Sequence, residues 1–220
     1  MPDRDIDMER NAHIDRVIED RRSIRAFSDE VPPREQVEEI VRAGLFAPYS
    51  PMSVGEEKIF RRFAVMESGS RGMAMAAEKI RRKVIESAEA LSQAAEADPE
   101  FGETARTFIG RLSSIASGSE IGFESAPCFI VVAEKKGFPP VELRSLAHCL
   151  ENMWLKATAL GIGFRLISAT SQLADDEEFC ELIGVSPGRF GLDSCALGYA
   201  AKDFPPTYRP PLDQAMRWLD

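Results

Sequence analysis

The apolar run Pro127–Ala133 is the feature that most constrains how this chain can fold. It reads PCFIVVA, has the length of a strand and is rich in β-branched residues. A strand that is apolar on both faces belongs in the middle of a sheet whose two faces are covered. A chain of 220 residues, 44% of them hydrophobic, is long enough to bury such a core. We therefore predict a central strand that is buried on both faces.

Helical patterns of apolar residues provide the cover for this strand. The most regular one spans Leu143–Leu160, and its apolar stripe is broad enough for a fully buried core helix. Another begins at Pro32-Pro33 and ends at Ala47-Pro48, because the residue before a proline avoids helical geometry. A shorter helix, capped by Asn11, follows a loose lead-in over residues 1–10. The apolar faces of the two N-terminal helices, the one after residue 11 and the one after Pro33, are expected to contain Ile14, Val17, Ile18, Val37, Ile40, Val41, Gly44 and Leu45.

Three further strands are expected around the central one, near Phe60–Met66, Phe164–Ser168 and Cys195–Tyr199. A short helix capped by Asp175 or Asp176 separates the last two of them. Its acidic first turn matches the helix dipole, which we favour over a metal site. The residues expected to pack in the first of these strands are Phe60, Phe63 and Val65.

Residues 68–120 form a helical excursion between the first strand and the central one. Met73–Ala97 is a long helical stretch that closes near Asp98-Pro99, and Phe101–Ser117 is a second helical run. One interpretation is a pair of amphipathic helices packed on the body, with Arg81-Arg82-Lys83 on a solvated face. The other is a lid over a site. Its adaptable apolar contacts would come from Met73, Met75, Phe101 and Phe108.

The C-terminal arm, residues 202–220, is dominated by proline. Phe204–Pro211 holds four prolines in eight residues and should run extended, with a final turn of helix over Leu212–Leu219. An extended arm cannot bury itself along its length. We therefore expect this arm to lie across another surface.

Composition argues against several classes of protein. The net charge of −9 disfavours nucleic-acid binding, which needs a basic face. No apolar run reaches the roughly 18 residues of a membrane span, and the charged first ten residues do not resemble a signal peptide. Four widely spaced cysteines without a C-x-x-C motif predict buried free thiols in a reducing cytoplasm. With only His13 and His148, neither a histidine-based zinc site nor a histidine-dependent hydrolase is expected, and His148 is interpreted as a core or interface residue.

A cationic stretch, Arg21–Arg25, stands out against this acidic background. Its sequence RRSIR places three arginines and one serine within five residues, and we call it the arginine-serine cluster. One interpretation is a solvated helix end, because cations complement the dipole at a helix C-terminus. The other is a phosphate-binding site, because guanidinium groups bind phosphate oxygens in pairs and a serine hydroxyl adds a further hydrogen bond. The residues alone leave both interpretations open.

Together with motifs elsewhere in the chain, the cluster resembles the opening of the FMN-dependent nitroreductase family. The resemblance covers roughly residues 12–66 and 124–212, and the order and spacing of its motifs are more specific than any one motif. Those motifs are Arg21-Arg22-Ser23-Ile24-Arg25-x-Phe27, Ala47-Pro48, Glu151–Ala157, Ala159–Gly163, Leu197-Gly198-Tyr199 and Arg209.

This resemblance implies a fold and a quaternary structure. The expected fold is α+β, with a mixed, mainly antiparallel sheet flanked by helices, in a single nitroreductase-like domain over residues 1–220. The expected assembly is a homodimer in which the C-terminal arm is exchanged, wraps the partner and extends its sheet. Two FMN molecules would sit at the dimer interface.

The resemblance also implies which residues bind the cofactor. The phosphate, ribityl chain and pyrimidine edge of FMN would be held by Arg21, Arg22, Ser23, Arg25, Thr207 and Arg209. The isoalloxazine ring and its N5 atom would be contacted by Pro48, Tyr49, Ser50, Ser168 and Ala169. No catalytic acid or base and no metal are expected, because hydride arrives from NADH or NADPH and leaves at the same face of the flavin.

The loop after Ala47 departs from the family pattern. Tyr49 stands where a serine is expected, and the asparagine and the Gln-Pro-Trp motif that usually follow are absent. Our first hypothesis is an FMN-dependent oxidoreductase that passes hydride from NAD(P)H to a small organic acceptor such as a nitroaromatic or a quinone. The second is a non-catalytic FMN-binding or flavin-handling protein of the same fold. The third is a structural, helical interaction protein.

Overall fold

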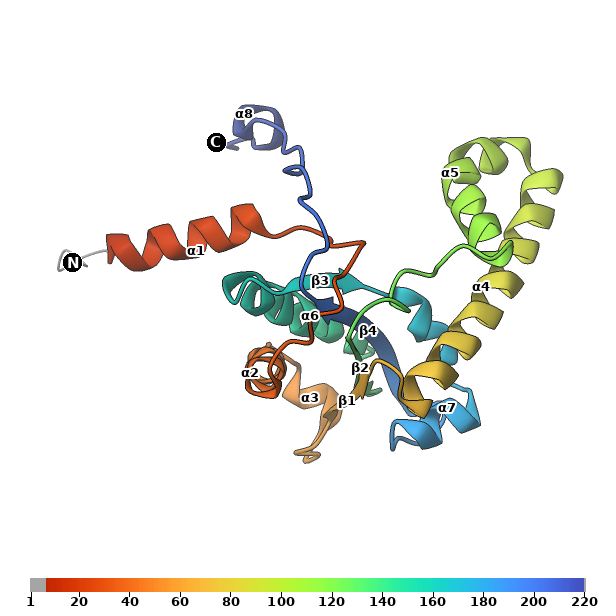
Figure 1. Cartoon of the computed structure of the whole chain (residues 1–220), viewed down its shortest axis with the longest axis horizontal. Helices are drawn as coiled ribbons and strands as arrows, with labels where there is room; N and C mark the ends of the chain where they lie inside the picture. Colours follow the sequence, from red (N-terminus) through yellow and green to blue (C-terminus); the bar gives the residue numbers. More distant parts are fainter. Residues whose placement is uncertain (1–6, 220) are drawn as a thin grey trace.

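The computed structural model describes residues 7–219, and a four-stranded sheet of order β1-β2-β4-β3 lies at its centre (Figure 1). All three neighbouring pairs of strands are antiparallel. A parallel bridge between Ser23 and Phe164 adds mixed character at the β3 edge. The predicted α+β fold with a mainly antiparallel sheet is therefore confirmed. The strands are β1 Arg61–Glu67, β2 Cys128–Lys135, β3 Gly163–Leu166 and β4 Phe190–Gly198.

Helices cover both faces of this sheet, α2 and α6 on one side and α4 and α7 on the other (Figure 1). A 3₁₀ helix, η1, follows β3 and packs against β4 and α4. The helices are α1 Met8–Asp20, α2 Arg34–Leu45, α3 Pro51–Val54, α4 Arg71–Ala97, α5 Pro99–Ala116, α6 Glu142–Ala159, η1 Ser168–Leu173, α7 Glu177–Leu182 and α8 Leu212–Ala215.

Strand β2 divides the core into two parts, as its sequence predicts. Successive side chains of a strand point to opposite faces. Ile130 and Val132 belong to the core cluster under α2 and α6, whereas Phe129 and Val131 belong to the cluster under α4. All four are at most 1% exposed. Burying each such side chain contributes roughly 1.5–3 kcal/mol, so this one strand fixes the position of both helical layers.

The N-terminal helix differs from the sequence prediction. Helix α1 begins at Met8 and is capped by Asp7, whose carboxylate accepts a hydrogen bond from the Arg10 amide at 2.9 Å, and not by Asn11. The expected lead-in is therefore helical from Met8 onward, while residues 1–6 lie outside the described part. Helix α1 projects from the body and buries none of its residues, so its apolar face is exposed (Figure 1).

Two other predicted faces were wrong in part. In β1, Val65 is 49% exposed while Arg61 is buried, because the Arg61 guanidinium meets the carboxylate of Glu134 on the neighbouring strand. In α6, His148 is exposed, so this helix buries one face and is not fully enclosed. Strand β4 begins at Phe190, earlier than Cys195. Leu45, which was expected on the apolar face of the helix before Ala47, also lies at the surface.

The excursion is a helical hairpin made of α4 and α5. Asp98 ends α4 and caps α5, accepting hydrogen bonds from two amides of the next turn at 3.1 Å. The hairpin is packed at its base, where Lys79 on α4 pairs with Asp176 at 2.7 Å. Arg81 is only partly exposed, because it donates to the Ile115 carbonyl and pairs with Glu124, so the solvated face predicted for Arg81–Lys83 was wrong at this residue.

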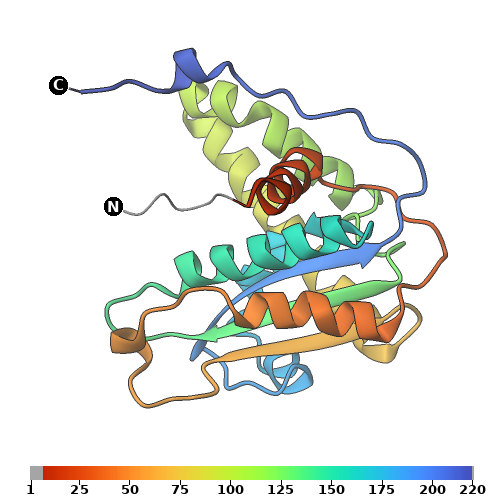
Figure 2. The same ribbon diagram turned by 90° about the vertical axis from the view of Figure 1, so that its left-hand side faces the viewer.

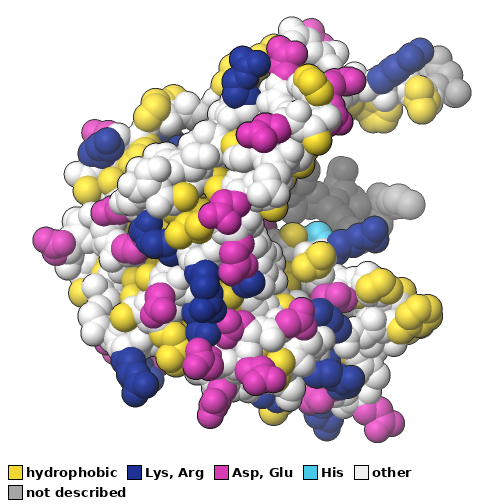
Figure 3. Space-filling model, turned by 90° about the vertical axis from the view of Figure 1, so that its right-hand side faces the viewer, with side chains coloured by type: hydrophobic (Ala, Val, Ile, Leu, Met, Phe, Trp, Pro, Cys, Tyr) yellow, Lys and Arg dark blue, Asp and Glu magenta, His cyan; other side chains and the backbone are white. Residues whose placement is uncertain are grey.

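Charged side chains line the outer surface of the molecule near this hairpin. Figure 3 looks onto this side and shows basic and acidic side chains intermixed. On α4, Lys83 pairs with Glu86 at 2.7 Å, and both side chains are at least 30% exposed.

The C-terminal arm runs extended from β4 and stays outside the sheet (Figure 2). Its final helix, α8, covers only Leu212–Ala215 and is shorter than predicted. Within the described residues no helix is long and apolar enough to cross a membrane. Large apolar side chains of the arm that are at least 70% exposed are Tyr208, Leu212, Trp218 and Leu219.

Candidate functional site

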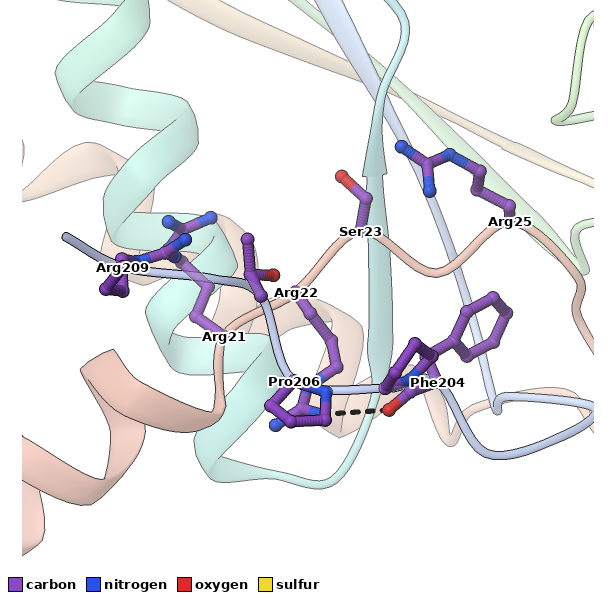
Figure 4. A pocket seen from close by; sticks show the side chains of 9 residues that line it. Arg21, Arg22, Ser23, Arg25, Phe204, Pro206 and Arg209 are labelled. Carbon is purple, nitrogen blue, oxygen red and sulfur yellow. Dashed lines mark hydrogen bonds between the residues drawn. The ribbon is translucent and has the colours of Figure 1, made fainter.

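The arginine-serine cluster lies along the β3 edge of the sheet. Helix α1 ends at Asp20, and the chain then becomes extended. The Ile24 amide donates to the Phe164 carbonyl at 3.0 Å, which holds the segment parallel to β3. Ser23 and Arg25 point to one side of this segment and Arg22 to the other (Figure 4), as successive residues of an extended chain must.

Two facing glycines allow the segment to approach the sheet this closely. Gly163 on β3 pairs with Gly198 on β4. A Cβ atom at Gly163 would lie 2.8 Å from both the Gly198 carbonyl oxygen and Cγ1 of Ile24, and one at Gly198 would lie 2.5 Å from Cδ of Pro127 and 3.0 Å from the Phe27 ring. These contacts are shorter than packed atoms allow, so a side chain at Gly163 would compete with Ile24 of the cluster for the same space.

A cavity of about 430 Å³ joins the cluster to the C-terminal arm. The Nη1 atom of Arg22 donates to the Phe204 carbonyl at 2.9 Å, and this bond holds the arm beside the cluster (Figure 4). Residues from opposite ends of the chain therefore line one space. The predicted site residues that it brings together are Arg21, Arg22, Ser23, Arg25, Thr207 and Arg209.

The arginines of this cavity differ in their partners. The Nε atom of Arg21 lies 3.0 Å from a Glu151 carboxylate oxygen, and its guanidinium sits 4.6 Å from the centre of the Trp154 ring. Both contacts orient Arg21. In the described part of the chain, Arg25 and Arg209 form no ion pair, and Arg209 donates only to the carbonyl of its neighbour Tyr208.

The cavity is therefore strongly cationic. It gathers four guanidinium groups, and the two carboxylates that pair with them, Glu151 with Arg21 and Asp20 with Arg22, are 46% and 70% exposed. Guanidinium donors without protein acceptors are suited to the oxygens of a phosphate group. Of the two interpretations of the cluster, this geometry favours an anion-binding site over a solvated helix end.

Ser168 and Ala169 line a second cavity, of about 490 Å³, between η1 and the excursion. Helices α4 and α5 form its far wall through apolar side chains that include Phe108 and Leu112. The excursion thus packs on the body at its base and walls a cavity farther along. Of the four residues named for a lid, Phe108 lines this cavity, and Met73, Met75 and Phe101 do not. Residues 23–25 run parallel to β3, and Ser168 and Ala169 follow β3 along the chain. The stretches that line the two cavities are therefore neighbours.

Pro48, Tyr49 and Ser50 do not meet the other predicted site residues within one chain. They line a separate cavity of about 200 Å³, together with residues of α6 that include Arg144 and His148. The Tyr49 ring packs on Phe60, with ring centres 4.0 Å apart. In a single copy of the chain, the predicted site residues therefore do not all meet in one cavity.

A buried ion pair that the sequence analysis missed supports this loop. The Arg61 Nε atom lies 2.7 Å from a Glu134 carboxylate oxygen, and both side chains are 2% exposed. The same guanidinium donates to the Gly44 carbonyl at 2.7 Å and to the Ser145 hydroxyl at 2.9 Å. Ser145 in turn donates to the Pro48 carbonyl at 3.2 Å. An arginine opening one strand and a glutamate closing the apolar run of the next could have revealed the pair.

The cysteines do not contribute nucleophiles or metal ligands to these cavities. All four are free and buried, as predicted. Burial raises the pKa of both Cys128 and Cys149 to about 12, which keeps these thiols protonated. Among residues 7–219, no cluster of three histidine, cysteine or acidic side chains is arranged to hold a metal ion.

Several solved structures share this fold. A nitroreductase with bound FMN from Desulfitobacterium hafniense DCB-2 is 24% identical, with a TM-score of 0.67, covering 94% of this chain and 98% of that one. A nitroreductase with bound FMN from Bacteroides fragilis NCTC 9343 is 21% identical, with a TM-score of 0.67 and coverage of 94% and 98%. A BluB-like flavoprotein from Clostridium difficile 630 is 19% identical, with a TM-score of 0.69 and coverage of 94% and 99%.

Comparison of the sequence alone also shows a likeness to nitroreductases. No curated protein matches the chain. The sequence model described as the nitroreductase family matches residues 18–199, which include the arginine-serine cluster and all four strands. Because this match spans most of its length, the chain belongs to the nitroreductase family.

Proposed function

We propose that this chain binds FMN and acts as an oxidoreductase that passes hydride from NADH or NADPH to a small organic acceptor such as a nitroaromatic or a quinone. The observation that carries this proposal is the cationic cavity of about 430 Å³, which brings arginines from both ends of the chain to one place. The structural relatives from Bacteroides fragilis and Desulfitobacterium hafniense contain FMN, and their fold is that of this chain.

The phosphate of FMN would bind between Arg21 and Arg209. Arg21 is already oriented by Glu151 and Trp154, so it loses little freedom on binding. Arg22 is committed to the Phe204 carbonyl and therefore positions the arm instead of the ligand. Thr207 lines the same cavity and adds a hydroxyl donor for phosphate.

The rest of the cofactor would follow the parallel segment beside β3. Ser23 would face the ribityl chain, and Arg25 lies on the same side of the segment (Figure 4). Bound FMN supplies the chemistry that accepts and donates hydride. A cation at Arg25 stabilises negative charge on the pyrimidine edge, and the apolar wall of α4 and α5 keeps water away from the Ser168 and Ala169 side.

A second copy of the chain would complete the site as a homodimer. Pro48–Ser50 is remote from the arginine-serine cluster within one chain, so the loop of a partner copy would contact the isoalloxazine ring. Exchange of the arms would cover the apolar side chains that α1 and the arm expose, such as Ile14, Ile18 and Trp218. Four unpaired thiols suit a reducing compartment such as the cytoplasm.

Titration of the full-length protein with FMN and with riboflavin tests the binding step. We expect one FMN per chain, and riboflavin should bind at least tenfold more weakly because it lacks the phosphate that charged hydrogen bonds hold, a loss of about 1.4 kcal/mol or more. Equal affinities would contradict the phosphate assignment, and absence of FMN binding would contradict the whole proposal.

Stopped-flow mixing with NADH and NADPH then tests the reaction step. Rapid bleaching of the flavin absorbance by either donor is expected for an oxidoreductase. Tight FMN binding without bleaching would instead support the second candidate, a non-catalytic flavin-handling protein. That candidate is favoured by one observation, which is that Tyr49 packs on Phe60 in a loop that lacks the usual amide side chains.

A further inference from the structure

The cavity beside the excursion contains two arginines that the proposed cofactor site does not use. Arg111 on α5 donates to the Glu120 carbonyl at 2.9 Å, and Arg165 on β3 donates to the Ile121 carbonyl at 3.0 Å. Neither forms an ion pair with a carboxylate among residues 7–219. Both therefore keep donors for a ligand in this cavity.

The loop over Arg165 is built to leave its guanidinium in place. Gly122 has a φ of +110°, and a Cβ atom there would lie only 1.8 Å from Nη1 of Arg165. The nearby carboxylate of Glu124 is occupied, because it accepts from the amides of Ile121 and Gly122 at 3.0 and 2.8 Å and pairs with Arg81 at 2.9 Å. Glu124 thus shapes the loop without pairing directly with Arg165.

Charges of both signs surround Arg165. Burial, followed by the charges of Arg111 and Arg25, lowers the pKa of Arg165 below its ordinary value, against the smaller opposing effect of the carboxylates of Glu124 and Glu120. Guanidinium groups nevertheless stay protonated at physiological pH. Like charges that face one another attract an anion, since each phosphate or carboxylate oxygen relieves their repulsion.

The remainder of the cavity is mostly apolar. Leu91 and Phe108 come from the excursion, and Leu166 and Ile167 come from the end of β3 and the residue after it. A volume of about 490 Å³ holds a small ring system. Ser168 and Ala169 border the same space, so a ring in this cavity would lie on the side where the proposed flavin exchanges hydride.

We propose that this cavity binds a planar ring that carries an anionic group, with the anion on Arg111 and Arg165 and the ring on the apolar wall. The role of this ligand as a substrate rests on the proposed function. Two kinds of molecule offer such an anionic ring. One is an acceptor with a carboxylate on its ring, and the other is the nicotinamide mononucleotide half of the electron donor.

Isothermal titration of the full-length protein with 1-naphthoate tests the site without turnover. Neutral 1-naphthalenemethanol is the matched ligand, and we expect it to bind roughly tenfold or more weakly, as expected for loss of a charged hydrogen bond. Arg111→Gln should reduce the affinity for naphthoate by a similar factor and leave the affinity for the alcohol unchanged. Arg106→Gln is the control, because it removes an exposed arginine from the same helix outside the cavity.

A second variant guards against misfolding. Arg165→Lys keeps the charge but loses the fork of donors, so it should also weaken naphthoate binding while the thermal unfolding midpoint stays near that of the natural chain. Equal binding of the acid and the alcohol, or unchanged naphthoate affinity in both Arg111→Gln and Arg165→Lys, would overturn the inference.

Competition identifies the source of the anion. Displacement of naphthoate by nicotinamide mononucleotide would assign the arginines to the donor, and persistence of naphthoate would assign them to a carboxylate acceptor. FMN affinity is measured separately by absorbance titration of the same variants. Failure of the naphthoate site with normal FMN binding would leave the proposed function intact, and naphthoate binding without FMN binding would overturn that function alone.

Discussion

Arg61 and two arginines of the cationic cavity, Arg25 and Arg209, place the same side chain in opposite circumstances. Arg61 is buried and has its donors directed to a carboxylate, a carbonyl and a hydroxyl of the protein. Arg25 and Arg209 lie at a cavity, and neither forms an ion pair within the described residues. The contrast teaches that the partners of an arginine, more than its neighbours in sequence, distinguish a side chain that holds the fold from one that is available to a ligand.

Removing Arg61 should have the largest effect on stability. Arg61→Met leaves the Glu134 carboxylate buried without a cation, which should cost about 3–5 kcal/mol of unfolding free energy. Urea denaturation followed by circular dichroism measures it. The double variant Arg61→Met with Glu134→Leu should recover most of the loss, because apolar residues can replace a buried ion pair. A single variant that unfolds like the natural chain would erase the contrast between the two regions.

Removing Arg21 should affect the ligand more than the fold. Arg21→Ala should weaken FMN binding by about 1.5–3 kcal/mol, the range for a hydrogen bond to a charged group. Its partner Glu151 is 46% exposed and can be solvated, so the unfolding free energy should change little. Fluorescence titration with FMN gives the affinity, and Arg34→Ala, at an exposed arginine on α2, is the control. Unchanged FMN affinity would place Arg21 with the structural arginines.

Asp176 extends the comparison to a carboxylate that holds the fold. Burial opposes ionisation, but hydrogen bonds from Lys79 and the Phe179 amide outweigh it and lower the pKa of Asp176. The stabilisation of the fold by ionised Asp176 is therefore fully present above the ordinary aspartate pKa, about 3.9. It is lost as the pH falls through the lower pKa of Asp176 in the folded state. Asp176→Ala should cost about 0.5–2 kcal/mol near neutral pH as a lost helix cap.

Denaturation curves across the acid range measure this effect. The natural chain should lose stability more steeply on acidification than Asp176→Ala does. Parallel profiles for the two proteins would show that Asp176 does not gain stability from its charge.

The smallest expected effect is that of a thiol reagent on the folded protein, where we expect no modification of the buried cysteines. Because burial raises the pKa of Cys128 and Cys149 to about 12, a thiol reagent at roughly pH 8 should not modify them while the protein is folded. All four cysteines should react after unfolding in guanidinium. Rapid modification of the native protein would reveal local opening of the sheet.

Local features of the sequence predicted much of the fold. The apolar run of β2, the apolar stripe of α6 and the helix end near Asp98-Pro99 each depend on residues a few positions apart, and the structure contains all three. The inward turn of Arg61 could not be predicted in this way, because its partner Glu134 is 73 residues away. When that partner is not known, the alternation of side chains along β1 predicts that its apolar residues are the buried ones.

The candidate site divides along the same line. The arginine-serine cluster and the arm were assigned to one ligand on the strength of a resemblance, and the cavity shared by Arg21 and Arg209 agrees with it. The placement of Pro48–Ser50 in a separate cavity depends on long-range packing under α6. Arg111 and Arg165 are brought together only by the tertiary fold, so spacing along the chain carried no indication of them.

The glycine pair in the sheet has a consequence for how binding strength can be adjusted. Ile24 touches the space that a side chain at Gly163 would need, and Ser23 and Arg25 are its covalent neighbours. A methyl group added at Gly163 would have to displace the Gly198 carbonyl on β4 or Ile24, and through Ile24 the two candidate site residues beside it. If these residues bind FMN, a substitution outside the cavity should change the affinity while the charge and the donors of the cavity lining stay as they are.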